Sequence, residues 1–262
     1  MSAPCEGDDL AALLAPLETI GLEALGSATL LERIDTKYII PVALLPLVMK
    51  ACGREYRALE VGDRRVFDYQ TRYFDTRDFR LYRAHVSERH PRNKVRIRRY
   101  GDHSAPVLEL KRKAPRGSTE KLRKEVSERE AAALEELRLP PFEGRGAPDP
   151  AELRPALDIT FRRATLVRLD GSERVTIDQG VRCEREGRHV HFPAVAIVEV
   201  KQARRARSPV TDAMRSLRQR PARISKYCIG VAALVPGVPV HELRRTLARL
   251  YSAPATLGGG DE

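Results

Sequence analysis

The stretch Lys94-Val95-Arg96-Ile97-Arg98 places basic and apolar residues in strict alternation. Successive side chains of a β-strand point to opposite faces of the sheet. A strand with this sequence therefore has one entirely cationic face and one apolar face. We expect the apolar face to pack in the core and the cationic face to line a functional surface.

Three more segments carry charge at every second position: Asp35-Thr36-Lys37, Glu109-Leu110-Lys111 and Glu199-Val200-Lys201. For any single strand, a charged face in water is the better interpretation, because antiparallel sheets usually have one solvated face. Repetition of Arg, Lys and Glu at matching offsets in distant segments favours a closed sheet whose charged faces converge. Such a surface would suit a polyanion together with a divalent metal.

Length and charge narrow the possible functions. The chain has 262 residues, a net charge of +11 and no tryptophan. This length fits one large domain or two small ones. The positive charge predicts an anionic partner, which could be nucleic acid, a membrane surface or a phosphate-rich small molecule.

Cysteine spacing and hydropathy bear on the compartment. Cys5, Cys52, Cys183 and Cys228 form no Cys-x-x-Cys pair, so we interpret them as free thiols in a reducing compartment. The N-terminus is acidic and lacks the basic region of a signal peptide. No apolar run reaches the roughly 18 residues that a membrane span needs. We therefore expect a cytoplasmic protein with no membrane span.

Hydrophobic periodicity and turn signals predict an α+β fold, with many antiparallel strands and helices packed outside. Strands are predicted at about 30–40, 66–74, 92–100, 106–113, 119–127, 157–169, 173–181 and 194–202. Helices are predicted at 8–25, 41–52, 75–87, 128–139, 208–218, 226–234 and 241–251. The Pro and Gly content of residues 140–150 predicts a linker, and the Gly-rich end is predicted to be disordered.

The predicted strands carry short motifs in a characteristic order: Asp35-Thr36-Lys37-Tyr38, Tyr73-Phe74-Asp75-Thr76, Val95-Arg96-Ile97-Arg98, Glu109-Leu110-Lys111, Arg174-Val175-Thr176-Ile177-Asp178, Val198-Glu199-Val200-Lys201 and Ser225-Lys226-Tyr227. This order resembles the catalytic domain of the vacuolar transporter chaperone (VTC) family, within the triphosphate tunnel metalloenzymes. The resemblance covers about residues 28–235. It leaves 1–27 as an N-terminal helical segment and 236–262 as a C-terminal helix and disordered tail.

The resemblance implies an antiparallel β-barrel that forms a basic tunnel, and a metal-dependent polyphosphate polymerase. Such an enzyme transfers the γ-phosphoryl group of ATP to a growing polyphosphate chain with Mn²⁺ or Mg²⁺. The implied phosphate-binding residues are Lys37, Arg96, Arg98, Lys111, Lys121, Arg123, Arg163, Arg174, Arg223 and Lys226. Of these, Lys226, Arg174 and Lys111 are the implied catalytic residues. Glu199 is the implied metal ligand, and Glu109 is either a second ligand or a counter-charge.

Two positions depart from the family pattern. Arg223 stands where the family often has lysine. Relatives that cleave triphosphate or cyclise ATP begin with Glu-x-Glu-x-Lys, whereas this chain reads Arg33-Ile34-Asp35-Thr36-Lys37, so we carry over no second metal site. His189 and His191 could ligate a metal, because both rings share one strand face, but histidines near a predicted turn are more often exposed and without function.

Three functions stay open on the sequence. The first is the polymerase, with ATP and polyphosphate as its ligands. The second is a triphosphate hydrolase on the same fold, in which water is the nucleophile. The third is a nucleic-acid binder, which should interleave aromatic residues with its basic ones. Aromatic residues make up only 5% of the chain, so we expect no nucleic-acid partner. The sequence identifies no membrane-associated partner protein.

Overall fold

The computed structural model is built around one strongly curved antiparallel sheet, and it describes residues 8–27, 34–101, 104–113, 119–132, 148–252 and 256–258. Eight strands follow one another across this sheet in the order β2-β11-β9-β8-β4-β5-β6-β7. Their bounds, in that order, are Ile34–Pro41, Val195–Gln202, Glu173–Arg185, Arg154–Arg168, Val66–Asp75, Arg92–Tyr100, Val107–Lys113 and Thr119–Glu125.

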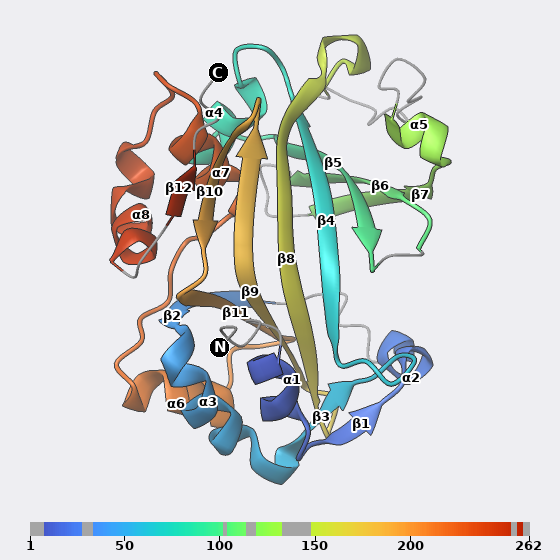
Figure 1. Ribbon diagram of the computed structural model, residues 1–262, viewed down its shortest axis with the longest axis vertical. Coiled ribbons are helices and arrows are strands. Elements are labelled where there is room, and N and C mark those ends of the chain that lie inside the picture. Colours follow the sequence, from blue (N-terminus) through green and yellow to red (C-terminus); the bar gives the residue numbers. More distant parts are fainter. Residues whose placement is uncertain are drawn as a thin grey trace, which may run out of the picture.

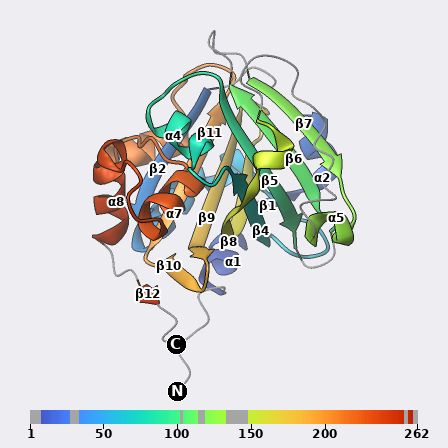
Figure 2. The ribbon, with the colours of Figure 1, turned by 90° about the horizontal axis from the view of Figure 1, so that it is seen from above.

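The curvature brings the two ends of this order opposite each other. Seen from above in Figure 2, β2 and β11 form one wall and β5, β6 and β7 form the other, joined through β9, β8 and β4. Among the described residues, the end strands β2 and β7 are not hydrogen-bonded to each other. The predicted α+β class is confirmed, and the sheet wraps around its charged face without closing through backbone hydrogen bonds.

Four short strands extend this sheet at its margins. Strand β9 pairs with β11 through its first half and with β10 (Arg188–Phe192) through its second half, and β10 also pairs with β12 (Thr256–Gly258). Strand β3 (Tyr56–Leu59) pairs with β8 and with β1 (Glu18–Ile20). The double pairing of β9 divides the sheet beyond this strand into two branches.

Helices cover both faces of the sheet (Figure 1 and Figure 2). Their bounds are α1 Asp8–Leu14, α2 Leu22–Ser27, α3 Leu45–Cys52, α4 Arg80–Val86, α5 Glu128–Ala132, α6 Pro209–Ser216, α7 Lys226–Leu234 and α8 Arg244–Tyr251. Short 3₁₀ turns are η1 Val42–Leu44, η2 Gly53–Glu55, η4 Pro150–Glu152 and η5 His241–Leu243. Helices α3 and α6 pack against the outer face of the sheet. Helix α7 packs on the concave face, against Leu157 and Ile159 of β8, so the prediction that the helices lie outside holds only in part. None of the helices in the described residues is long and apolar enough to cross a membrane.

The apolar face predicted for the 94–98 stretch lies in the core. Val95, Ile97, Leu108 and Leu110 are at most 2% exposed and form one cluster beneath β5 and β6, together with Leu153. Burying a side chain of this size contributes about 1.5–3 kcal/mol to the free energy of unfolding. The period-two alternation therefore fixes which face of each strand remains for charged side chains.

The same division holds at the opposite wall. Val198 and Val200 of β11 are buried in a second cluster with Val48 of α3 and with Val210 and Met214 of α6. Helices α3 and α6 lie side by side at the lower end of the molecule in Figure 1. The inner side chains of β11, Glu199 and Lys201, are consequently directed away from this core.

Side chains that cap the first turn fix where several helices begin, and the sequence predicts some of these caps. Ser127 and Glu130 form the predicted capping box, with each side chain bonded to the other residue's backbone N–H. Ser208 caps α6 in the same manner with Thr211. The carboxylate of Asp75 accepts the N–H groups of Leu81 and Tyr82 at 2.9 and 2.8 Å, so it orients α4 from the end of a strand.

Some predicted elements differ from the structure. The predicted helix 8–25 is wrong in its middle: it is interrupted after Leu14, because Pro16 cannot donate the backbone bond that a helix interior needs. Strand β1 replaces its centre by pairing with β3, and neither β3 nor β10 was predicted. Helix 75–87 begins only at Arg80. Parts of other predictions lie outside the described residues: the start of strand 30–40, the end of helix 128–139, most of the 140–150 linker and most of the Gly-rich end.

Candidate functional site

The curved sheet surrounds a cavity of about 380 Å³, which we call the basic cavity. Its lining comes from β2, β4, β5, β6, β7, β8, β11 and α7. Ten of the lining side chains are cationic and three are carboxylates. The cationic ones are Lys37, Lys94, Arg96, Arg98, Lys111, Lys121, Arg123, Arg163, Lys201 and Lys226. This excess of positive charge in a half-enclosed space suits a ligand with several negative charges.

Strand register places each carboxylate of the lining, and Asp178 behind the cavity wall, opposite a base; Asp35 is the partner of Lys201. Glu109 on β6 is the direct partner of Arg96 on β5. Glu199 on β11 is the partner of Lys37 on β2, and Arg163 on β8 that of Asp178 on β9. Directly opposed side chains lie about 4.5–5.5 Å apart at Cβ. The ion pairs of the site therefore follow from backbone pairing.

Glu109 holds the guanidinium groups at one end of the basic cavity. Arg96 donates to it from Nε at 2.6 Å, and Arg123 lies 3.2 Å from its other oxygen. Tyr100 donates its hydroxyl to the same carboxylate at 3.2 Å. Burial alone would raise the pKa of Glu109, but Arg96 and Arg98 lower it below its usual value. The carboxylate is thus charged at neutral pH and is paired with these cations.

Glu199 lies between two lysines. Its oxygens are 2.9 Å from Nζ of Lys201 and 3.6 Å from Nζ of Lys37. Burial would raise its pKa, yet these two cations hold the pKa well below the usual range. Glu199 is therefore an ionised hard-oxygen group that faces the cavity.

Asp178 anchors two cations from beneath the cavity wall. It is 1% exposed and accepts both Nε and Nη2 of Arg163, at 2.5 and 2.7 Å. Nζ of Lys226 donates to the same carboxylate. Although burial opposes ionisation, Arg163 and Lys226 lower the pKa of Asp178. This bidentate geometry is the strong form of an Arg–carboxylate contact.

Aromatic rings support the cations from the side. Arg163 lies over Tyr69 with its Cζ 4.9 Å from the ring centroid, and Lys226 lies over Phe161 at 4.4 Å. Tyr73 accepts a hydrogen bond from Nη1 of Arg96 at 3.0 Å. Burial would raise the pKa of Tyr73, but the surrounding cations, led by Arg96, lower it to about 8. The rings and ion pairs together hold these cations in fixed orientations.

Crowding of like charges weakens the protonation of the lysines. Burial, followed by Lys94 and Lys37, lowers the pKa of Lys111 to about 8. Burial also lowers the pKa of Lys94, whose ammonium donates to the hydroxyl of Ser225 at 3.1 Å. An anion in the cavity would relieve this repulsion, so these lysines are suited to bind phosphate oxygens.

The structure brings most of the predicted phosphate-binding residues together. The predicted residues that line the basic cavity are Lys37, Arg96, Arg98, Lys111, Lys121, Arg123, Arg163 and Lys226, together with Glu109 and Glu199. Arg174 is on the same face of β9 as Asp178 and opposite Lys201, but it is not part of the lining. Arg223 is exposed and pairs with Glu88, away from the lining.

The predicted set lacks several residues of the lining, among them Lys94, Lys201 and Tyr73, and also Asp178 behind the wall. Lys94 and Lys201 share faces with Arg96 and Glu199, so the same alternation could have found them. Asp178 lies on the same face of β9 as Arg174, but no local sequence pattern predicts that it pairs with Arg163. Tyr73 gave no sequence signal for its contact with Arg96. These last two contacts depend on strand register.

The donor set bears on metal binding. Among the described residues, no three or more His, Cys, Asp or Glu side chains are grouped so that they could hold a metal ion by themselves. Glu109 and Glu199 nevertheless both present ionised oxygens to the basic cavity. Mg²⁺ is usually held by one or two carboxylates together with substrate phosphates. The residues therefore fit a metal that is shared with a bound polyanion.

Comparison with known proteins assigns the chain to a family. A model of the VTC domain matches residues 32–145 and 148–235, which is well over half of the chain. The chain belongs to the VTC domain family. The matched region contains every residue that lines the basic cavity. No curated protein matches this VTC domain.

Solved structures with a similar course of the chain share little sequence with it. One is a putative adenylyl cyclase from Hippeastrum described with a dominant triphosphatase activity, at 16% identity and a TM-score of 0.47, covering 78% of this chain and 97% of that one. Another is the PH1819 protein from Pyrococcus horikoshii OT3, at 15% identity and a TM-score of 0.44, covering 76% and 96%. Family membership and the basic cavity support an enzyme of polyphosphate or triphosphate chemistry.

Proposed function

We propose that this VTC domain is a metal-dependent polyphosphate polymerase that transfers the γ-phosphoryl group of ATP to a growing polyphosphate chain. The observation that carries the proposal is the basic cavity, in which ten cationic side chains outnumber three carboxylates. Phosphoryl transfer depends mainly on positioning and on neutralising phosphate oxygens, and needs little covalent work from the protein. A cavity of this charge is suited to that task.

The cations fall into two kinds with different tasks. The planar fork of Arg binds two phosphate oxygens at once, whereas Lys acts as a point charge. Arg96 and Arg163 are already oriented by Glu109 and Asp178, so they would hold the phosphates in register. Lys111 and Lys226 would neutralise charge on the transferred group. Arg174 lies opposite Lys201 and outside the lining, so its role as a catalytic residue stays a prediction.

The proposed step exchanges one phosphate anhydride for another. An oxygen of the acceptor's terminal phosphate attacks the γ-phosphorus of ATP, a new P–O bond forms, and the bond to the β–γ bridging oxygen breaks. ADP leaves with that oxygen. No protein group has to take part covalently, because the acceptor oxygen is already ionised at neutral pH. Orientation by the cavity is therefore the main contribution of the chain.

The metal would be Mn²⁺ or Mg²⁺. Glu199, and with it Glu109, would supply the protein oxygens, while the phosphates would supply the others. When bound, such a cation neutralises phosphate oxygens and polarises the phosphoryl group. Lys37 and Lys201 already contact Glu199, so they would compete with a metal for its oxygens and would be available to phosphate oxygens.

Product analysis separates the polymerase from the triphosphate hydrolase. The full chain is incubated with ATP and Mn²⁺, and the products are resolved on a gel alongside an assay for ADP. We expect polyphosphate longer than the added primer, formed in step with ADP. Free phosphate without any longer chain would contradict the polymerase and favour the hydrolase, and no consumption of ATP or tripolyphosphate would contradict both.

A further inference from the structure

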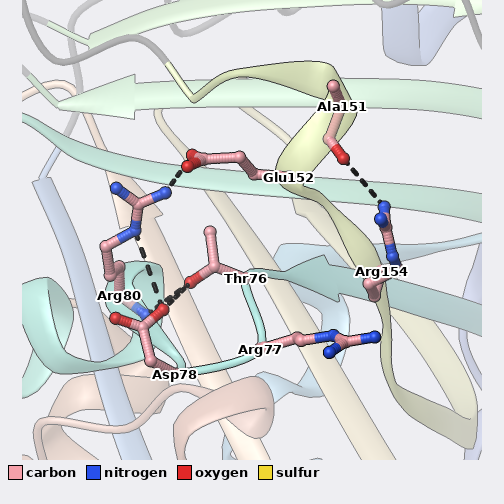
Figure 3. Close-up of a pocket in the computed structure, with 7 residues that line it drawn as sticks. All are labelled: Thr76, Arg77, Asp78, Arg80, Ala151, Glu152 and Arg154. Atoms are coloured by element: carbon pink, nitrogen blue, oxygen red, sulfur yellow. Dashed lines mark hydrogen bonds and ion pairs between the residues drawn. The ribbon is translucent and has the colours of Figure 1, made fainter.

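A second cavity lies outside the charged interior of the sheet. It measures about 470 Å³ and is lined by Thr76, Arg77, Asp78, Arg80, Ala151, Glu152 and Arg154 (Figure 3). These residues belong to the turn after β4, the start of α4, the turn η4 and the first residue of β8. None of them lines the basic cavity. The size falls within the range of small-molecule sites, about 300–1,000 Å³.

The charges of this second cavity are unevenly distributed. On one side Arg80 is paired with Glu152 and lies 3.7 Å from Asp78, and Asp78 also accepts the hydroxyl of Thr76 at 2.7 Å. Both carboxylates are therefore matched. Figure 3 shows these four side chains together on one side, linked by hydrogen bonds and ion pairs.

The other side carries two guanidinium groups. Figure 3 shows Arg77 and Arg154 directed to the same side of the cavity, away from Asp78 and Glu152. Arg154 donates through Nη1 to the carbonyl oxygens of Ala151 and Leu153, at 2.9 and 2.7 Å. Within the described residues, Arg77 has no ion pair or hydrogen bond, and Arg154 has no carboxylate partner. Two adjacent positive charges thus remain without a counter-ion.

The backbone that presents Arg77 is fixed. The buried carboxylate of Asp75 accepts the N–H of Thr76 at 2.7 Å, and the carbonyl of Thr76 accepts the N–H of Phe79 at 3.0 Å. Phe79 adopts a left-handed conformation with φ of 56°. A turn held at this many points positions its side chains before a ligand arrives, which lowers the cost of binding.

We propose that this second cavity binds a phosphate group, with Arg77 and Arg154 as its ligands. Guanidinium groups match the geometry of phosphate oxygens and form charge-assisted hydrogen bonds with them. A phosphate dianion would neutralise both arginines, while Arg80 shields it from the two carboxylates. The site is separate from the basic cavity, so the proposal stands whether or not the basic cavity is a polymerase.

The test measures phosphate binding and locates it. The full chain is titrated with inorganic phosphate at constant ionic strength by calorimetry, and backbone hydrogen exchange is followed with and without phosphate. We expect Arg77→Ala to weaken binding at this site about ten-fold, as for the loss of one charge-assisted contact, and Arg77→Ala/Arg154→Ala to abolish it there, so that only binding in the basic cavity remains. Phosphate should slow exchange in residues 76–82 and 150–154.

The control variant Arg188→Ala/Arg244→Ala removes the same charge from two exposed arginines elsewhere and should bind phosphate as the parent does. Because Arg77 makes no ion pair or hydrogen bond with the part of the chain that the structure describes, its substitution should not disturb folding. The hydrogen-exchange experiment is repeated with a phosphomonoester in place of inorganic phosphate. If both anions slow exchange equally, the site binds a terminal phosphate group. If only inorganic phosphate slows exchange, the site binds the free anion. Protection confined to residues 92–113, or equal affinities of all variants, would overturn the proposal.

Discussion

Replacing Asp178 with asparagine should destabilise the empty protein. The substitution removes a buried carboxylate that holds Arg163 through two bonds and also accepts Lys226. Removing one partner of a buried ion pair costs about 3–5 kcal/mol. Both cations face the basic cavity, where water screens them, so we expect about 3 kcal/mol, at the low end of that range. For a chain of this size the melting temperature should fall by about 6–12 °C.

The same substitution should strengthen the binding of a polyanion. Arg163 and Lys226 would lose their counter-ion, and a phosphate chain could replace it. At about 8 Å and an effective dielectric constant of about 20, one unit charge contributes about 2 kcal/mol, which corresponds to about thirty-fold in the dissociation constant. Tripolyphosphate should therefore raise the melting temperature of Asp178→Asn more than that of the parent. Turnover should fall, because the two cations are no longer held in position.

Thermal melts and calorimetry with tripolyphosphate test this reasoning. The control is Asp158→Asn, since Asp158 binds Arg72 in the same bidentate manner, at 2.8 and 3.0 Å, but outside the cavity and half-exposed. Exposed pairs contribute about 0–1 kcal/mol, so this variant should match the parent in both assays. If tripolyphosphate binds Asp178→Asn no more tightly than the parent, Asp178 does not compete with the ligand for these cations.

Four further outcomes are expected. Glu199→Gln should abolish nearly all Mn²⁺-dependent turnover of ATP while circular dichroism shows an intact fold; parent-like turnover would rule out Glu199 as the metal ligand. Arg96→Ala should weaken tripolyphosphate binding about ten-fold or more in a calorimetric titration, and unchanged affinity would contradict the cavity as the phosphate site. Burial and neighbouring lysines lower the pKa of Lys111 to about 8, and Tyr73 in the same cavity has a pKa of about 8, so tripolyphosphate affinity should fall as the pH rises through that value. Lys111→Arg should reduce this step, and Lys111→Arg/Tyr73→Phe should remove it. Over the same range the unfolded chain binds a proton that the folded chain lacks, so the free energy of unfolding of the empty protein should rise with pH; a fall there would contradict the lowered pKa. Gly230→Ala would place a Cβ atom 2.4 Å from Cδ2 of Leu157 and should cost about 1–3 kcal/mol in urea unfolding, whereas an unchanged midpoint would show that the neighbouring side chains can move aside.

Local alternation predicted the inner and outer faces of the strands, because side-chain direction in a strand depends only on position. Arg96 and Arg98 line the cavity and Val95 and Ile97 lie in the core, as the spacing predicts. The strand bounds at β5 and β6 also agree to within a residue, since Gly101 and the flanking polar residues give strong turn signals.

Partners across the sheet could not be predicted in this way. That Asp178 neutralises Arg163 depends on the register between β8 and β9, and that Lys37 meets Glu199 depends on pairing between strands far apart in the chain. Short strands at the margin of the sheet, such as β3, form because they pair with a neighbouring strand, and their own hydrophobic pattern does not predict them. The role of Arg223 stays a prediction, and its side chain pairs with Glu88 outside the cavity.

The pairing of β2 with β11 has a consequence for how the protein is made. Residues 34–41 reach the ribosome exit early, but their only strand partner in the described sheet lies at 195–202. Contacts between such distant segments form late in folding, since a long loop must first be closed. During synthesis Lys37 therefore has no counter-charge from Glu199, and the anion-binding capacity of the cavity arises in one late step with the arrival of β11 and α7.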